Sequence, residues 1–259
     1  MSDIQDRVII VTGAAGQLGR AYTSALLERK AKVAAIDCRA IDLNPNKNLK
    51  ILSVDITNKS HLEAASNEIQ EDWGSIDGLI NNAGVDAPPD APVEETGPFE
   101  SYPEEAWDKV LNVNLKGIFL CCQVFGLAMA RQKKGSIVNI GSIYGMVSPD
   151  QSLYEYRRTR GENFFKPVAY SASKSGIYNL TRYLATYWGR QNVRVNTLTL
   201  GGVFNHQDSE FLEAYAKRVP IGRMALVEDY IDPIVFLVSD SSAYVTGSNL
   251  VVDGGWTAL

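Results

Sequence analysis

The chain has 259 residues with a formal net charge of −5 at pH 7, and 45% of its residues are hydrophobic and 21% charged. This composition is typical of a soluble globular protein long enough for one large core, and the acidic balance argues against a nucleic-acid-binding surface. Its two histidines and three cysteines (Cys38, Cys121 and Cys122) have no metal-ligand spacing and form no disulfide framework. Because the first residues contain neither a signal peptide nor a membrane span, we expect a cytoplasmic protein with no metal, nucleic-acid or membrane partner.

The chain begins with a strand, a glycine-rich turn and a helix. Arg7–Thr12 is a continuous β-branched run that predicts a buried parallel strand, and residues 13–19 form the turn before a helix-forming stretch at 20–30. This arrangement aims backbone N–H groups at a phosphate, although glycines also serve plain tight turns.

The second predicted strand, residues 32–37, ends in an acid. Asp37 follows Gly19 at about the spacing where a carboxylate meets an adenosine ribose, which favours NAD over NADP because the carboxylate repels a 2′-phosphate. Arg39 weakens this preference, because a flexible guanidinium could accept that phosphate.

Two further strands are predicted at 49–55 and 77–84, with an amphipathic helix at 57–73 between them. Asp55 closes the first of these strands, near an adenine edge. Residues 85–103 hold five of the ten prolines and predict a surface loop, which either borders a site or is a plain excursion.

A long apolar helix is predicted at 104–132, and around Asn114 polar residues and a glycine interrupt it, so we expect a kink with a bound water. A fifth strand at 135–141 delivers Ser142 just past its end. Ligands of parallel sheets lie outside the carboxyl ends of the strands. The residues predicted at that edge are Gly13, Asp37, Asp55, Asn81 and Ser142.

Tyr170 and Lys174 lie four residues apart at the start of a helix predicted at 169–190, so they share one face. An ammonium beside a phenol favours the phenolate, which predicts a lowered pKa for Tyr170 and a proton donor and acceptor for an alcohol or ketone. Taken alone, the pair is more typical of an ordinary amphipathic helix; the convergence at the strand ends favours a site.

The rest of the chain completes an alternating α/β pattern. Residues 146–166 show no sustained period, and a sixth strand is predicted at 193–198. A flap of loops and one short helix spans 203–224. A helix at 227–239, with Pro233 in its first turn, precedes a last strand at 247–252.

In this order, the motifs resemble those of the short-chain dehydrogenase/reductase family over nearly the whole chain. The matching pieces are Thr12, Gly13, Gly19, Asn81–Gly84, Asn114, Ser142, Tyr170, Lys174, Asn196 and Val252–Gly255. The resemblance implies one α/β domain over residues 1–259, a Rossmann fold with a doubly wound, mostly parallel seven-stranded sheet and helices on both faces. A weaker resemblance, around Ser148–Gln151 and Phe164–Pro167, points to members of bacterial surface-sugar and flagellin-glycan pathways.

The family resemblance also implies roles for single residues. Tyr170 would exchange the proton with the substrate oxygen, Ser142 would donate a hydrogen bond to that oxygen, and Lys174 would hold the nicotinamide ribose. Asn114 would hold a water that links Lys174 to solvent. The expected cofactor contacts are Gly13, Gln17, Leu18, Gly19, Asp37, Asp55, Ile56, Asn82, Ala83, Gly84, Tyr170, Lys174, Gly201 and Val203, and the expected substrate contacts include Ser142, Tyr144 and Tyr170.

Two positions depart from the family pattern, and one segment is added. Gln17 replaces a glycine and either crowds the pyrophosphate or adds a polar contact, whereas Leu200 replaces a proline and leaves the backbone near the nicotinamide less restrained. An insertion of about residues 147–166 carries three arginines, Arg157, Arg158 and Arg160. They suggest a lid that binds a phosphate, carboxylate or nucleotide-sugar diphosphate, or else a solvated or subunit-contact loop.

The sequence therefore predicts an NAD(P)(H)-dependent oxidoreductase that interconverts a secondary alcohol and a ketone. An anionic or phosphorylated sugar or nucleotide sugar is the favoured substrate, and a neutral small alcohol or ketone the alternative. A catalytically silent dinucleotide-sensing protein is disfavoured because Tyr170 and Lys174 are both present, and a sugar epimerase or dehydratase would need a further carboxy-terminal domain. Because relatives assemble through helices like 104–132 and 169–190, we expect a homotetramer or homodimer.

Overall fold

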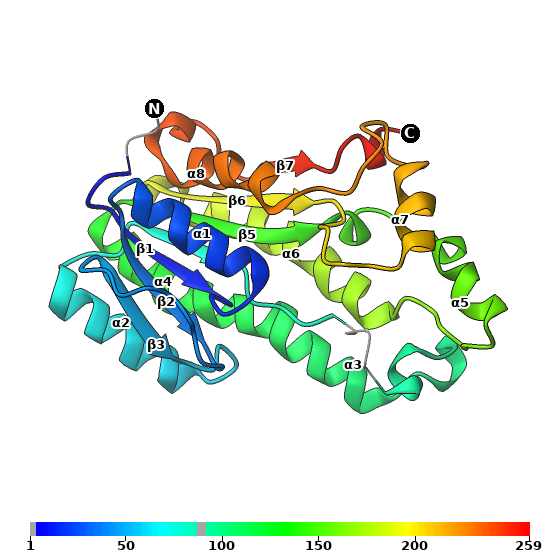
Figure 1. Ribbon diagram of the computed structural model, residues 1–259. Helices are drawn as coiled ribbons and strands as arrows, with labels where there is room; N and C mark the ends of the chain where they lie inside the picture. Colours follow the sequence, from blue (N-terminus) through cyan, green and yellow to red (C-terminus); the bar gives the residue numbers. More distant parts are fainter. Residues whose placement is uncertain (1–3, 87–91) are drawn as a thin grey trace.

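The computed structural model describes residues 4–86 and 92–259, and within them seven strands form one sheet. The order across the sheet is β3-β2-β1-β4-β5-β6-β7, and every pairing is parallel (Figure 1). This confirms the predicted Rossmann sheet. The strands are β1 (Val8–Thr12), β2 (Lys32–Asp37), β3 (Leu49–Ser53), β4 (Gly78–Asn81), β5 (Gly135–Ser142), β6 (Val193–Leu200) and β7 (Asn249–Val252).

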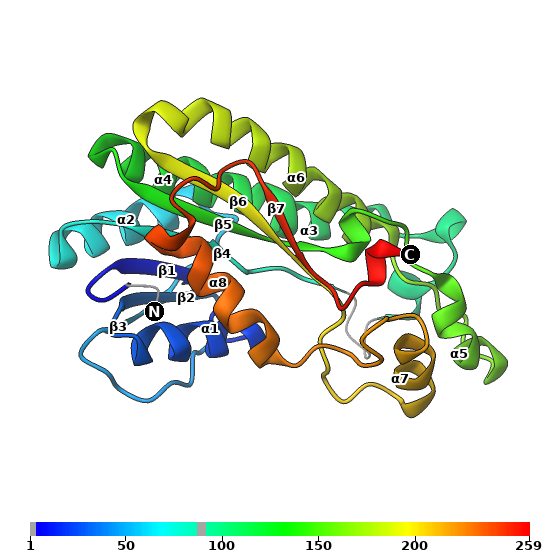
Figure 2. The same ribbon diagram turned by 90° about the horizontal axis from the view of Figure 1, so that it is seen from above.

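Helices cover both faces of this sheet. One face carries α1 (Gln17–Glu28) and α8 (Ile231–Val238), and the other carries α2 (Lys59–Trp73), α4 (Ile118–Gln132) and α6 (Val168–Trp188) (Figure 2). Each layer has its own apolar cluster, so the central strands are buried on both sides and read as continuous apolar runs.

Local signals in the sequence set several helix ends. The Asn58 side chain accepts hydrogen bonds from the backbone N–H groups of Ser60 and His61, which caps α2. Pro233 lies in the first turn of α8, where its missing N–H costs no helical hydrogen bond.

The predicted helix at 104–132 is continuous but changes its winding. It consists of α3 (Glu104–Leu111), a π-helical segment at Asn112–Gly117, and α4. The expected kink is therefore a π-helical stretch, a feature that is frequent at functional sites. Among the described residues, Glu104–Gln132 is the one helix long and apolar enough to cross a membrane, and 56% of its most apolar window is buried inside the fold, as in a core helix.

The insertion and the flap pack on each other. The insertion is folded rather than irregular, with a 3-10 turn at Gln151–Tyr154 and the short helix α5 (Glu155–Thr159). Figures 1 and 2 show α5 beside α7 (Ser209–Ala216) of the flap, beyond the carboxyl ends of the strands. A third apolar cluster joins them: Leu153, Tyr154, Phe164, Phe211, Tyr215, Val219 and Met224.

Candidate active site

The site begins where β1 and β4 lie side by side and the strand order reverses, the usual ligand position in such sheets. Thr12 Oγ1 accepts hydrogen bonds from the backbone N–H of Asn82 (3.1 Å) and of Ala83 (3.0 Å), and Asn82 Nδ2 donates to the carbonyls of Thr12 and Gly13. β4 therefore ends at Asn81, earlier than predicted, because the next residues turn toward β1.

The glycine-rich turn is packed so closely that only glycine fits at two positions. Gly13 has a φ of +68°, and a Cβ there would lie 2.7 Å from Ala83 Cα. At Gly19 a Cβ would lie 2.2 Å from the carbonyl oxygen of Gly13. The turn leads into the N-terminus of α1, where free N–H groups favour an anion. These residues therefore fit the pyrophosphate of a dinucleotide.

The two departures from the family pattern are accommodated by contacts on the flap side. Gln17 Nε2 donates to the carbonyl of Phe204 at 2.9 Å, so its side chain reaches the flap, close to Val203. Leu200 is the last residue of β6, and the backbone after it is held, contrary to the expectation of looser restraint. The N–H of Gly201 donates to Val252 at 3.0 Å, and its carbonyl accepts from the Tyr230 hydroxyl.

Asp37, at the end of β2, is buried and locks the glycine-rich turn. Its carboxylate accepts the N–H of Ala15 at 3.0 Å, and the N–H and Nε of Arg39 at 2.9 and 3.4 Å. Burial raises the pKa of Asp37, but the hydrogen bonds from Arg39 and Ala15 outweigh it and hold the pKa below its usual value. Arg39 is thus drawn to Asp37.

At the end of β3, Asp55 and Ile56 form the adenine side of the predicted site. The Asp55 carboxylate accepts the N–H and the hydroxyl of Thr57, both at 2.8 Å, which fixes the turn into α2. Ile56 is buried against Gly117, where a Cβ would lie only 2.6 Å from Ile56 Cδ1. Contact of Asp55 and Ile56 with a cofactor stays a prediction.

Ser142 and Tyr170 meet at the end of β5. Their side chains lie close enough for the Ser142 hydroxyl to lower the pKa of Tyr170, and Ser142 Oγ accepts the N–H of Tyr144 at 3.2 Å. The Tyr178 hydroxyl donates to the Ser142 carbonyl at 2.8 Å and is hydrogen-bonded to Thr199 Oγ1. Tyr178 was not anticipated from the sequence, although it lies four residues after Lys174 on the same helical face.

Lys174 is buried beside this pair. Its Nζ donates to the Ile140 carbonyl at 2.9 Å and lies 5.8 Å from the centroid of the Tyr170 ring. Burial lowers the pKa of Lys174 to about 8. The expected fall in the pKa of Tyr170 is not found: desolvation raises it, the Asp86 carboxylate raises it further, and only the Ser142 hydrogen bond lowers it. Tyr170 is therefore a protonated phenol at neutral pH.

Asn114, in the π-helical segment, ties the end of β4 to α6. Its side chain exchanges two hydrogen bonds with the backbone of Val85, at 2.7 and 2.8 Å, and donates to Ser173 Oγ at 3.1 Å. A Cβ on Gly84 would lie 3.3 Å from Asn114 Oδ1 and 3.6 Å from Lys174 Nζ, so Asn114 and Lys174 lie close together. The water-holding role of Asn114 stays a prediction.

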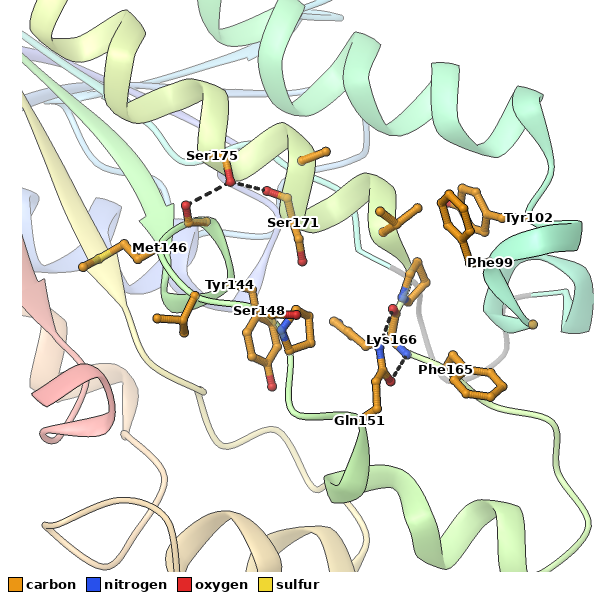
Figure 3. Close-up of a pocket in the computed structure, with 17 residues that line it drawn as sticks. Phe99, Tyr102, Tyr144, Met146, Ser148, Gln151, Phe165, Lys166, Ser171 and Ser175 are labelled. Carbon is orange, nitrogen blue, oxygen red and sulfur yellow. Dashed lines mark hydrogen bonds between the residues drawn. The ribbon is translucent and has the colours of Figure 1, made fainter. Parts of the chain in front are cut away.

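A pocket of about 500 Å³ adjoins this centre (Figure 3). Tyr144 and Lys166 line it, and the Lys166 ammonium lies 5.0 Å from the centroid of the Tyr170 ring, whereas Ser142 and Tyr170 are not among the lining residues. Its other walls are Gly97, Phe99, Tyr102, Gly145–Pro149, Gln151, Phe165, Pro167, Val168, Ser171, Ala172 and Ser175.

The three arginines of the insertion face carboxylates of their own region. Arg157 is paired with Glu162 at 2.6 Å, Arg158 with Glu155 at 2.7 Å, and Arg160 with Glu210 of the flap. None of them lines the pocket. The cation that does, Lys166, forms an ion pair with Asp86. Lys166 carried no predicted role, although its position four residues before Tyr170 was the available signal.

Comparison with known proteins gives a consistent result. A family model described as "Enoyl-(Acyl carrier protein) reductase" matches residues 13–257. The chain is 35% identical to NAD-dependent glycerol dehydrogenase of Listeria innocua serovar 6a, with 98% of this chain and 95% of that protein covered. It is 32% identical to post-translational flagellin modification protein A of Campylobacter coli, with 98% and 99% covered.

A solved structure is also similar. It is a short chain dehydrogenase from Leptospira borgpetersenii with bound NAD+, which is 32% identical, has a TM-score of 0.88, and matches over 98% of this chain and 94% of that one.

Proposed function

The chain belongs to the short-chain dehydrogenase/reductase family and is an oxidoreductase of CH–OH groups, and on that premise we propose that it interconverts a secondary alcohol and a ketone of a small neutral polyol or sugar. The observation that carries the substrate class is the pairing of the insertion's arginines with Glu162, Glu155 and Glu210, which leaves their charges compensated. The glycerol-oxidising relative supports the same class.

The proton-transfer part of the reaction belongs to Tyr170. In the reductive direction its protonated phenol donates to the carbonyl oxygen of the substrate, and in the oxidative direction the phenolate takes the proton from the alcohol. The nicotinamide cofactor, when bound, would supply the hydride acceptor, NAD, for oxidation and the hydride donor, NADH, for reduction. The Ser142 hydroxyl, which lies beside Tyr170 at the end of β5, donates to the same substrate oxygen as negative charge develops on it.

Lys174 is the cation of this centre. Its pKa of about 8 keeps it mostly charged at neutral pH, and its Nζ lies 5.8 Å from the centroid of the Tyr170 ring. In this proposal Lys174 also holds the nicotinamide ribose, and Asn114 connects it to solvent through a water.

We assign NAD as the preferred cofactor from the surroundings of Asp37. Its carboxylate lies at the end of β2, held by Ala15 and Arg39, where it accepts ribose hydroxyls and repels a 2′-phosphate. Arg39 is paired with this carboxylate, which weakens its attraction for a phosphate. The NAD-dependent relative and the NAD-bound structure support this choice, and NADP is the alternative.

The anionic-sugar hypothesis has weaker support than the neutral one. It would need Arg157, Arg158 or Arg160 to leave a carboxylate partner and turn toward the pocket. The similarity to a flagellin modification protein is consistent with a sugar substrate but does not require a charged one.

The test is a steady-state assay of NAD reduction with matched neutral and phosphorylated sugars. Tyr170→Phe should lower turnover about 10²–10⁴-fold while NADH still binds, because only the proton donor is removed. Tyr244→Phe, a fully exposed tyrosine, is the control and should match the wild type. Retained turnover in Tyr170→Phe, or equal activity on both sugar classes, would contradict the proposal.

We further propose a homo-oligomer in a cytoplasmic setting. The outer faces of α4 and α6 expose Phe119, Leu127, Tyr183 and Tyr187, a concentration of large apolar side chains that is typical of subunit contacts. Light scattering should give a dimer or tetramer, and Tyr183→Glu should shift it toward smaller species.

A further inference from the structure

The feature that the proposed mechanism leaves unused is Lys166, the second lysine beside Tyr170. It lies at the end of the insertion, just before α6. Gln151 holds its backbone by two hydrogen bonds: Gln151 Oε1 accepts the N–H of Lys166 at 2.9 Å, and Gln151 Nε2 donates to its carbonyl at 3.2 Å (Figure 3). These two hydrogen bonds fix the backbone of Lys166 at the pocket, and with it the position from which the side chain extends.

The charge of Lys166 is placed where a substrate would meet it. Its side chain is only 11% exposed, and its ammonium lies 5.0 Å from the centroid of the Tyr170 ring, nearer than that of Lys174. Within residues 4–86 and 92–259, Lys166 is the one charged residue that lines the pocket. Any charged group on a substrate bound here would interact first with this cation.

That charge is compensated by Asp86, which follows β4 and forms an ion pair with the Lys166 ammonium. We propose that the Lys166–Asp86 pair is the charge filter of the substrate pocket, and that Asp86 makes the site select uncharged hydroxyl substrates by neutralising Lys166. This inference rests on the proposed oxidoreductase function and specifies its substrate class.

The physical basis is the cost of separating an ion pair whose ammonium is largely shielded from water, although its carboxylate is partly exposed. A carboxylate or phosphate on a substrate could use Lys166 only by displacing Asp86, and the two anions would repel each other. A polyol meets no such cost, because its hydroxyls can donate to the carboxylate and accept from the ammonium without breaking the pair. Without Asp86, the nearly buried ammonium would lack its partner and attract an anion.

The experiment measures binding rather than turnover, so its outcome does not depend on the proposed chemistry. Sorbitol and gluconate share a carbon skeleton and differ at one terminus, which is CH₂OH in one and a carboxylate in the other. Their dissociation constants for the enzyme saturated with NADH are measured by calorimetry for the wild type, Asp86→Asn, Lys166→Met and the double variant. The wild type should favour sorbitol, and Asp86→Asn should shift the ratio toward gluconate by about tenfold or more.

In the double variant the shift in the sorbitol-to-gluconate affinity ratio should vanish, because the cation left without its carboxylate partner in Asp86→Asn is Lys166. Asp72→Asn is the matched control: Asp72 pairs with Lys50 at the β3 edge, far from the pocket, and this lysine is also largely shielded. An unchanged ratio in Asp86→Asn, a shift that persists in the double variant, or no binding of either probe would overturn the filter. Failure of the proposed oxidoreductase function would be seen in a different measurement, because it would appear as retained turnover in Tyr170→Phe.

A pH profile gives a readout that a merely structural role of Asp86 would not produce. Because Asp86 raises the pKa of Tyr170, Asp86→Asn should move the Tyr170-dependent limb of kcat/KM to lower pH. The other groups around Tyr170 are unchanged in this variant: Ser142, Tyr144, Lys166, Lys174 and Tyr178. If this limb of the kcat/KM profile stays at the same pH in Asp86→Asn, the inferred proximity of Asp86 to the reacting centre is contradicted.

Discussion

Two regions at the carboxyl ends of the strands are built by different means. The acid–base centre (Asn114, Ser142, Tyr170 and Lys174) is held by short hydrogen bonds to backbone groups of β5 and of the segment after β4. The insertion–flap unit (residues 147–166 and 203–224) is held by an aromatic cluster, by ion pairs near the surface and by a few backbone hydrogen bonds such as Phe165 N–H to Thr96. The first region is fixed mainly by backbone groups at the strand ends and the second mainly by side chains.

Polar bridges join the two halves of the insertion–flap unit. The Tyr156 hydroxyl donates to Asp208 at 2.8 Å, Arg160 pairs with Glu210, and Arg218 pairs with Asp150 at 2.6 Å. Exposed pairs of this kind contribute little stability each, so this unit can change its side chains without disturbing the sheet. If the proposed function is right, we therefore expect the chemistry to depend on the strand ends and substrate choice to depend on the insertion–flap unit.

Removal of the Ser142 hydroxyl tests the acid–base centre with the largest expected effect. Ser142→Ala removes a donor to the substrate oxygen, so kcat should fall about 10²–10³-fold. NADH binding should be unchanged, because Ser142 belongs to the substrate side of the centre. The measurements are steady-state kinetics and NADH fluorescence titration. A fall of less than tenfold would mean that the substrate oxygen does not lie against Ser142.

The buried Lys174 predicts a pH dependence of stability. Its pKa is about 8 in the folded protein and 10.5 ordinarily, so between these values the unfolded chain holds a proton that the folded chain has lost. Stability should therefore rise with pH across this window, by roughly 3 kcal/mol at most. Urea unfolding at pH 7 and pH 10 should show this gain in the wild type relative to Lys174→Met. An identical pH response in both proteins would refute the shifted pKa.

The glycine-rich turn and the juxtaposition of Tyr170 and Lys174 could be predicted from the sequence because their signals are local. Gly13 and Gly19 mark a turn that excludes any Cβ, and Tyr170 and Lys174 are four residues apart on one helix. The surroundings of Arg160 could not be predicted, because its partner Glu210 is 50 residues away and only the folded chain brings them together. The raised pKa of Tyr170 was missed for the same reason: burial and Asp86 are tertiary effects.

A smaller effect is expected from the aromatic cluster of the insertion–flap unit. Phe211 is buried between Tyr154 and Tyr215, and Phe211→Leu should cost about 1 kcal/mol of stability, which lowers Tm by about 2–4 °C. The KM for substrate should rise while the NADH dissociation constant stays the same. An equal change in both constants would show that the unit is coupled to the cofactor half, and the comparison of the two regions would fail.

The smallest effect is expected at Arg160, and it separates the two interpretations of the insertion most sharply. If Arg160 only bridges α5 to Glu210, Arg160→Gln should cost less than about 1 kcal/mol of stability and leave the kinetics with neutral and anionic probes alike unchanged. Glu210→Gln should have the same effect, and the double variant should add little to either, because both variants break one pair. If activity on anionic substrates is lost in Arg160→Gln but not in Glu210→Gln, the Arg160 guanidinium binds the substrate. The insertion would then take part in substrate binding and not only in packing against the flap.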